Sequence, residues 1–269
     1  KYKGTNGEIV DQLERRLTGQ GLMVNDTNTR KVEVSSFAKP NILDTIKLDK
    51  ALRLAKQKSK DGQLQEAKNI CTDILQKFPK NKQALLVIQT LAQAYNSMAN
   101  ALMQKGDSEA AIEGYEQAIS IKPDCAEAYY NVGILLENNG NPDAAIDSYM
   151  QVLRIIPSHA GAYNNIGNAL KDKGDFEAAI GSYNTAVLIK PDYAEAYYNL
   201  GLAQYDQGDL KAAIESYNHA LKIKPEYAEA YNNIGNALKD KGELDAATGY
   251  YKQALKIKPD YANAHYNMG

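Results

Sequence analysis

A proline recurs in this chain every 34 residues, and this spacing constrains the fold more than any other feature. Glycine and tyrosine keep the same interval. The sets are Pro123, Pro157, Pro191, Pro225 and Pro259; Gly106, Gly140, Gly174, Gly208 and Gly242; and Tyr115, Tyr149, Tyr183, Tyr217 and Tyr251. A fixed period of this length is typical of stacked structural repeats. Counted from Ala92, five full units reach Tyr261, and a sixth begins at Ala262 and stops at Gly269.

Each unit predicts two helices, for example Glu195–Gln207 followed by Leu210–Ile223. Gly208 suits the left-handed residue that ends the first helix, and the side chain of Asp209 can cap the next one. The second helix is expected to end before the proline, which disfavours helical geometry at the preceding residue. A glycine inside each first helix costs about 1 kcal/mol against alanine. We therefore expect close helix packing at these glycines, which are Gly133, Gly167, Gly201 and Gly235.

The residues of one unit resemble the tetratricopeptide repeat, with tyrosine where tryptophan is commoner. The positions that carry the resemblance are Tyr129, Val132, Gly133, Gly140, Ala145, Tyr149, Val152 and Pro157. The resemblance implies an all-α fold, a right-handed superhelical solenoid of antiparallel helix pairs. It also implies that the first helices line the inner, concave wall. The match is strongest over residues 92–269.

The rest of the chain departs from this regular pattern. Leu48–Asn81 reads as a degenerate repeat, and Lys82–Leu91 continues the apolar spacing of the following helix. In the irregular N-terminal segment, Ile9, Leu13 and Leu17 could form a short helix that caps the solenoid, or one without such a role. The predicted organisation is an N-terminal segment 1–47, a degenerate repeat with a helical extension 48–91, five repeats 92–261, and a truncated repeat 262–269. We expect the protein to continue past Gly269.

The charge and hydropathy of the chain limit the classes of partner that it is expected to bind. With 31 basic and 33 acidic residues, the net charge of −2 offers no field for nucleic acid or an anionic membrane, and we expect neither as a partner. The longest apolar run is far below the roughly 20 residues needed to cross a bilayer. No charged and then apolar leader opens the sequence. These features favour a cytoplasmic location.

The sequence contains no pattern typical of a catalytic or metal-binding site. His159, His219 and His265 fall at unrelated repeat positions, without metal-ligand spacing. The glycines occur singly rather than clustered as in a phosphate-binding loop. Cys71 and Cys125 have no ligand cluster around them and are predicted to be small buried thiols. We therefore expect no catalytic residue, no metal and no cofactor in this chain.

Asparagine occupies one position of the first helix in five successive units, at Asn131, Asn165, Asn199, Asn233 and Asn267. A carboxamide carries a donor and an acceptor, so it can pair with the peptide bond of any guest sequence. A similar ladder lines the repeat domain of the nucleocytoplasmic O-linked N-acetylglucosamine transferases. The alternative is that asparagine is tolerated here because it is solvated. The predicted peptide-binding residues are Asn131, Asn165, Asn199, Asn233, Asn267, Asn168, Asn236, Tyr130, Tyr198, Ile134 and Leu202.

The first helices also alternate with a double period. Asn164–Gly174 and Asn232–Gly242 share the sequence NNIGNALKDKG, whereas the intervening units carry Tyr130 with Ile134 and Tyr198 with Leu202. Polar and apolar bands of this kind could hold alternate side chains of an extended peptide. A duplicated block of two repeats would leave the same pattern.

Three functions are compatible with these observations. The first is a protein interaction scaffold that binds an extended peptide segment in the concave groove. The second is the substrate-recruiting arm of a larger sulfotransferase or glycosyltransferase, because the repeats resemble those of bacterial proteins fused to such domains. The third is end-to-end self-association through an exposed terminal repeat. All three assign protein or peptide partners to the chain, and none assigns it catalysis.

Overall fold

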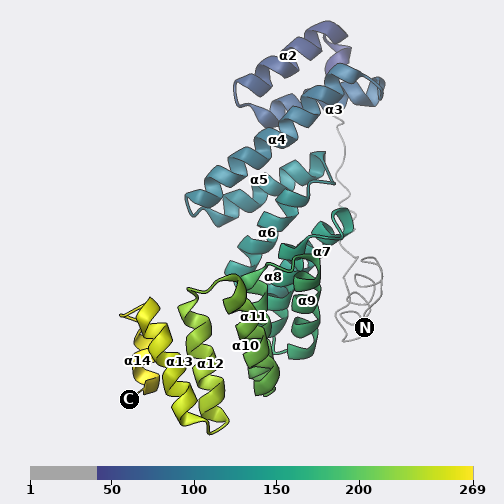
Figure 1. Cartoon of the computed structure of the whole chain (residues 1–269). Helices are drawn as coiled ribbons and strands as arrows, with labels where there is room; N and C mark the ends of the chain where they lie inside the picture. The colour runs from purple at the N-terminus through teal and green to yellow at the C-terminus, as the bar shows by residue number, and fades with distance from the viewer. Residues whose placement is uncertain (1–40, 269) are drawn as a thin grey trace. The chain divides into compact units, whose positions relative to one another are not determined.

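The computed structural model describes residues 41–268, and this part of the chain is all helical (Figure 1). It forms two compact units, residues 41–135 and 136–268. The elements are η1 (Ile42–Asp44), α2 (Leu48–Lys60), α3 (Leu64–Lys77), α4 (Lys82–Gln104), α5 (Ser108–Ile121), α6 (Ala126–Asn138), α7 (Pro142–Ile155), α8 (Ala160–Asp172), α9 (Phe176–Ile189), α10 (Ala194–Gln207), α11 (Leu210–Ile223), α12 (Ala228–Asp240), α13 (Leu244–Ile257) and α14 (Ala262–Met268). The proposed capping helix on Ile9, Leu13 and Leu17 lies outside the described residues.

The core of residues 41–135 is built by α2, α3 and α4. Helices α2 and α3 form a hairpin that packs against α4, and α4 also packs along α5. Helix α4 is one unbroken helix of 23 residues, because no glycine or proline interrupts it. Small side chains such as Ala51, Ala67 and Ala84 are fully buried between these helices and let them approach closely.

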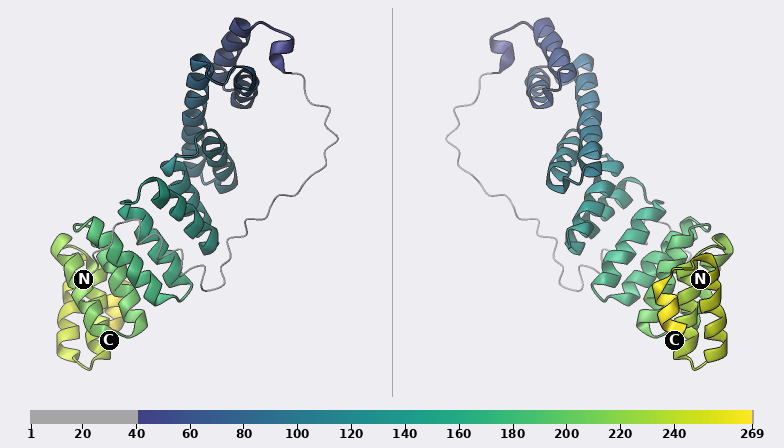
Figure 2. Two further views of the ribbon diagram at one scale, coloured as in Figure 1. Left: turned by 90° about the vertical axis from the view of Figure 1, so that its right-hand side faces the viewer. Right: turned by 90° about the vertical axis from the view of Figure 1, so that its left-hand side faces the viewer.

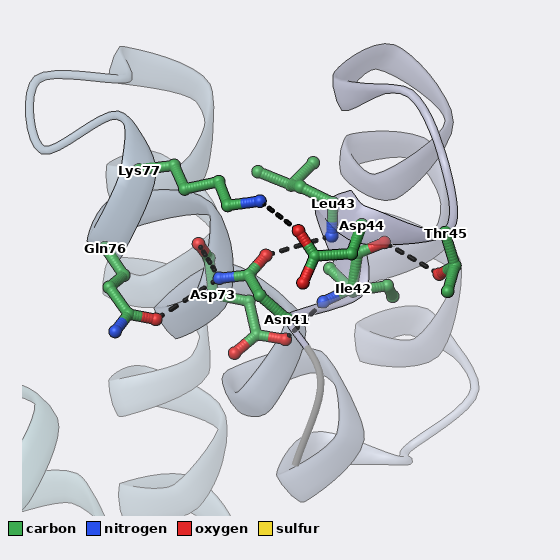
Figure 3. A network of polar contacts seen from close by, with 8 residues as sticks. All are labelled: Asn41, Ile42, Leu43, Asp44, Thr45, Asp73, Gln76 and Lys77. Atoms are coloured by element: carbon green, nitrogen blue, oxygen red, sulfur yellow. Dashed lines mark hydrogen bonds and ion pairs between the residues drawn. The ribbon is translucent and has the colours of Figure 1, made fainter. Parts of the chain in front are cut away.

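The short helix η1 is fixed to α3 by a network of polar contacts (Figure 3). The Ile42 amide donates to Oδ2 of Asp73 over 2.9 Å, and Asn41 Nδ2 donates to the Asp73 carbonyl over 3.0 Å. Lys77 forms an ion pair with Asp44. Ile42 and Leu43 pack on the core of α2 and α3. This segment therefore covers apolar surface of the degenerate repeat, a role that the sequence did not suggest for it.

Residues 136–268 form successive antiparallel hairpins that lie side by side in chain order (Figure 2). Helix α8 pairs with α9, α10 with α11, and α12 with α13. Adjacent hairpins contact one another through α9 with α10 and α11 with α12. The predicted all-α solenoid of helix pairs is confirmed.

The turns between the paired helices follow the sequence signals. The backbone at Gly208 has φ +92°, and Oδ1 of Asp209 accepts from the Ala212 amide over 3.0 Å. Helix α10 starts one residue before the predicted Glu195, and α11 has the predicted bounds. The cap and the left-handed glycine thus set the hairpin turn as expected.

The glycines inside the first helices contact tyrosines of the paired second helix. A Cβ added at Gly201 would lie 2.5 Å from the ring of Tyr217, and one at Gly167 would lie 2.6 Å from the ring of Tyr183. Both tyrosines are fully buried. The prediction of close packing at Gly167 and Gly201, and at Gly235 against Tyr251, is confirmed.

The two cysteines lie in different surroundings. Cys71 is fully buried, as predicted, and burial raises the pKa of its thiol to about 11. The prediction was wrong for Cys125, which is only half buried because it lies in the turn before α6. Both are free thiols.

A thiol reagent at pH 8 is expected to label Cys125 rapidly and Cys71 slowly, because the thiolate is the reactive species and Cys71 is both buried and protonated. Mass spectrometry of the labelled chain over time measures the two rates. In urea both sites should react at similar rates. Equal rates in the native protein would contradict the buried position of Cys71.

Candidate functional site

The predicted binding residues lie on the first helices of the repeats, at intermediate exposure. We define the first-helix surface as the half-buried side chains that α8, α10, α12 and α14 present, all within residues 136–268. Tyr130, Asn131 and Ile134 lie on α6 and belong to residues 41–135. Each predicted residue is thus partly accessible, and none is fully buried.

The asparagine ladder connects successive first helices. Asn199 Nδ2 donates to Oδ1 of Asn164 over 3.1 Å, linking α10 to α8. Asn233 Nδ2 donates to the Tyr198 hydroxyl over 3.0 Å. Asn267 likewise donates to Oδ1 of Asn232 over 3.0 Å. These bonds tie each repeat to the one before it, a role that the sequence analysis did not anticipate.

A second row of asparagines supports the tyrosines of the paired helices. Asn168 Oδ1 accepts from the Tyr183 hydroxyl over 2.7 Å. Asn236 Oδ1 accepts from the Tyr251 hydroxyl over 3.0 Å and from Asn267 Nδ2 over 2.9 Å. These carboxamides satisfy hydroxyl groups that would otherwise be buried without a partner. Asn168 and Asn236, predicted as binding residues, therefore also hold the hairpins together.

Asn164 and Asn232 are two buried carboxamide residues of the first helices whose role sequence reasoning missed. They are 0% and 3% exposed, and each donates Nδ2 to Oδ1 of the ladder asparagine that follows it in sequence, Asn165 or Asn233. A buried carboxamide is tolerated when its hydrogen bonds are made. The signal was present in the sequence, because both occur in the repeated NNIGNALKDKG segments.

The aromatic half of the alternation is also engaged within the protein. The Tyr198 ring lies 4.8 Å from the Tyr227 ring and 5.8 Å from the Tyr217 ring, measured between centroids. Burial raises the pKa of Tyr198, and so does the neighbouring Tyr261 hydroxyl. Leu202 packs on the same core and remains half exposed. Tyr198 and Leu202 thus form an apolar band between the carboxamides of α8 and α12.

The ladder residue in residues 41–135 makes a related set of contacts. Asn131 Nδ2 donates to Oδ1 of Asn100 and to the Tyr115 hydroxyl, both over 3.1 Å. Glu127 Oε1 accepts from the Nδ2 groups of Asn96 and Asn100 over 3.0 and 3.2 Å. Polar side chains thus connect α4 to α6 through Asn96, Asn100, Glu127 and Asn131.

The histidines serve local structure. His159 Nδ1 accepts from the Ala162 amide over 3.0 Å and caps α8. The His219 ring stacks on the Tyr197 ring with 5.1 Å between centroids, and His265 Nε2 lies 2.8 Å from the Pro259 carbonyl oxygen.

Across residues 41–268, no three His, Cys, Asp or Glu side chains gather in a way that could hold a metal ion. No helix of this part of the chain is long and apolar enough to span a membrane.

An open pocket of about 290 Å³ lies in residues 41–135. It is lined by residues 62–66, which comprise the end of the turn after α2 and the first residues of α3, together with Tyr95 and Met98 of α4. It contains none of the predicted binding residues and no cluster of charged groups. The pocket therefore does not point to a second candidate site.

Comparison with known proteins gives consistent matches to repeat proteins. Family models described as "TPR repeat" and "Tetratricopeptide repeat" match residues 99–140, 167–208, 203–242 and 235–269, and residues 126–159, respectively. A crystal structure of MamA protein is 32% identical with a TM-score of 0.58, over 64% of this chain and 93% of that one. The match to MamA from Desulfovibrio magneticus RS-1 is 23% identical, with a TM-score of 0.59 over 64% and 97%.

A crystal structure of YrrB, described as a TPR protein with an unusual peptide-binding site, is 23% identical to this chain. Its TM-score is 0.55, over 64% of this chain and 89% of that one. No curated protein sequence matches. These matches concern repeat proteins and provide no link to a transferase.

Proposed function

Because this chain belongs to the tetratricopeptide repeat family, we propose that it is a protein interaction scaffold that binds an extended segment of a partner on the first-helix surface. The observation that carries this proposal is the periodic row of half-exposed carboxamides, one on each of α8, α10, α12 and α14. A guest in extended conformation presents peptide groups at regular spacing, and such a row can pair with them.

The ladder residues keep hydrogen-bonding capacity after their contacts within the protein are counted. Among residues 41–268, Asn199 uses one Nδ2 hydrogen, which leaves its second hydrogen and its Oδ1 for a guest. Asn267 donates both Nδ2 hydrogens and keeps Oδ1 as an acceptor. The contacts between repeats also fix the orientation of these carboxamides, which lowers the entropy lost when a guest binds.

The likeness to YrrB supports the same assignment at the level of the fold. That protein combines a similar repeat structure with a peptide-binding site. The half-buried apolar band of Tyr198 and Leu202 would then contact guest side chains, while Asn199 and Asn233 contact the guest backbone.

Replacing Asn165, Asn199 and Asn233 together with alanine is expected to weaken binding of a captured partner at least tenfold. One net hydrogen bond contributes about 0.5–1.5 kcal/mol, so three sites reach the factor of ten that about 1.4 kcal/mol represents. Isothermal titration calorimetry of the purified partner measures the change.

The matched control replaces Asn184 and Asn218 of the second helices α9 and α11 with alanine, which should leave the affinity unchanged. Circular dichroism must show that the threefold variant remains helical, because the ladder also links the repeats. Unchanged affinity in a folded threefold variant would remove the ladder from the binding mechanism.

A further inference from the structure

One buried tyrosine hydroxyl breaks the pattern of the repeats. In three repeats the second-helix tyrosine donates to the asparagine 15 residues before it, as Tyr183 does to Asn168 and Tyr251 to Asn236. The position 15 residues before Tyr217 is Leu202. Tyr217 is 0% exposed, and its hydroxyl has no hydrogen-bond partner among the described residues.

The repeat of α6 and α7 also lacks the asparagine but replaces it in another way. Position 134 is isoleucine, and the Tyr149 hydroxyl donates to Glu137 over 2.8 Å. The residue of α10 that corresponds to Glu137 is Tyr205, whose hydroxyl donates to Asp240 instead. The hairpin of α10 and α11 therefore has neither the asparagine nor the glutamate acceptor for its tyrosine hydroxyl. An unpaired buried hydroxyl carries the full desolvation cost of the group, so a tyrosine at this position suggests that a bound partner supplies the missing hydrogen bond.

The Tyr217 hydroxyl lies beside side chains of the first-helix surface. Tyr198, Leu202 and Tyr205, all of α10, pack against the core cluster that contains Tyr217. Burial raises the pKa of Tyr217, with further contributions from Tyr198 and from the Asp206 carboxylate. Asn233 of α12 lies next to this hydroxyl, and its carboxamide lowers the pKa of Tyr217 in part, while one of its Nδ2 hydrogens is donated to the Tyr198 hydroxyl over 3.0 Å. Leu202, which lies where three other repeats have the asparagine, remains half exposed, and a guest could reach the buried hydroxyl only if the Leu202 side chain turned aside.

Helix α10 carries negative charge that no residue of its own offsets. It contains Glu195 and Asp206 and no lysine or arginine. Asp206 is exposed and lies in the last turn, where the helix dipole disfavours a carboxylate. In α8 the corresponding carboxylate, Asp172, has Lys171 at 3.2 Å. In α12 a lysine also precedes the corresponding aspartate.

We propose that Asp206, Leu202 and the Tyr217 hydroxyl form a subsite for an arginine side chain of the bound partner segment. The inference rests on the proposed function and names the side chain that the first-helix surface selects. A guanidinium has five N–H donors in a planar fork, so it can donate to the Asp206 carboxylate and to the Tyr217 hydroxyl together. Its aliphatic stem then lies against the apolar band of Tyr198 and Leu202.

Pools of acetylated and amidated nonapeptides test this inference, with arginine, lysine, glutamine or glutamate fixed at the centre and random residues around it. Fluorescence anisotropy with the full chain measures binding of each pool. The arginine pool should bind about tenfold more tightly than the glutamine pool, with lysine between them, because lysine has no planar fork. Glutamate should bind most weakly.

Two variants and one control locate the effect. In Asp206→Asn, the arginine pool should bind no more tightly than the glutamine pool. Asp172→Asn on α8 should leave the preference for the arginine pool unchanged. Leu202→Asn restores the carboxamide found in the neighbouring repeats. It should reduce the arginine preference and raise the thermal unfolding midpoint, because the Tyr217 hydroxyl gains an acceptor within the protein.

The possible failures are distinguishable. Equal binding of all four pools to the wild-type chain would overturn the arginine subsite and leave the scaffold proposal standing. An arginine preference that persists in Asp206→Asn would likewise overturn the subsite alone. If none of the pools binds, both the subsite and the proposed peptide-binding function are contradicted.

Discussion

Replacing Tyr183 with alanine is expected to lower the free energy of unfolding by about 3–5 kcal/mol, the range for removing a large aromatic side chain from a packed core. Tyr183 is fully buried, its ring packs on Gly167, and its hydroxyl donates to Asn168. The substitution removes this packing and leaves the Asn168 carbonyl oxygen without its donor. Urea unfolding followed by circular dichroism measures the loss.

The neighbouring residue provides the control for this change. Asn184 is exposed on α9, so Asn184→Ala should change the free energy of unfolding by less than about 0.5 kcal/mol. A further variant, Tyr183→Phe, keeps the ring and removes only the hydroxyl, with an expected loss of about 0.5–1.5 kcal/mol. A loss below about 1 kcal/mol for Tyr183→Ala would contradict the view that the second-helix tyrosines hold the hairpins.

The second large effect is expected at a glycine. In Gly201→Ala the new Cβ would lie 2.5 Å from the Tyr217 ring, so the ring or the helix must move. Overpacking of this kind costs about 1–3 kcal/mol, against a gain of about 1 kcal/mol in helix propensity. We expect a net loss of up to about 2 kcal/mol, measured by the same urea titration.

Gly181 provides the matched comparison for Gly201. It lies in the interior of α9, and a Cβ added there meets nothing within 4 Å. Gly181→Ala should therefore stabilise the protein by up to about 1 kcal/mol. The two substitutions are chemically identical, so the difference in sign isolates the contact with Tyr217. A gain in stability from both would show that the ring moves aside without cost.

Much of the fold could be predicted from the sequence because its determinants are local and repeated. Gly208 and Asp209 specify a helix end and a helix start within two residues, and each proline sets where a second helix stops. The 34-residue interval then reveals which helices pair. The role of η1 could not be predicted in this way, because its contacts join Asn41 and Ile42 to Asp73, far along the chain, without a repeated pattern.

The sequence predicted where the residues of the candidate site lie on the helices, but it did not predict their hydrogen-bond partners. The sequence placed Asn199 and Asn233 on one face of the first helices, where the structure has them half buried. It could not reveal that Asn199 donates to Asn164, since a carboxamide pairs equally well with a guest, with water or with a neighbour. The unpaired Tyr217 hydroxyl was also invisible, because a missing partner leaves no motif.

The contacts between first helices have a consequence for how such chains change in length. A ladder asparagine bonds to a preceding carboxamide in one repeat, as Asn199 does to Asn164, and to a preceding phenol in the next, as Asn233 does to Tyr198. The same Nδ2 donor can therefore pair with either kind of acceptor, a carboxamide or a phenol. Repeats can therefore be gained, lost or reordered during evolution, or joined in new orders by protein engineers, and the hydrogen bond between adjacent first helices is still made.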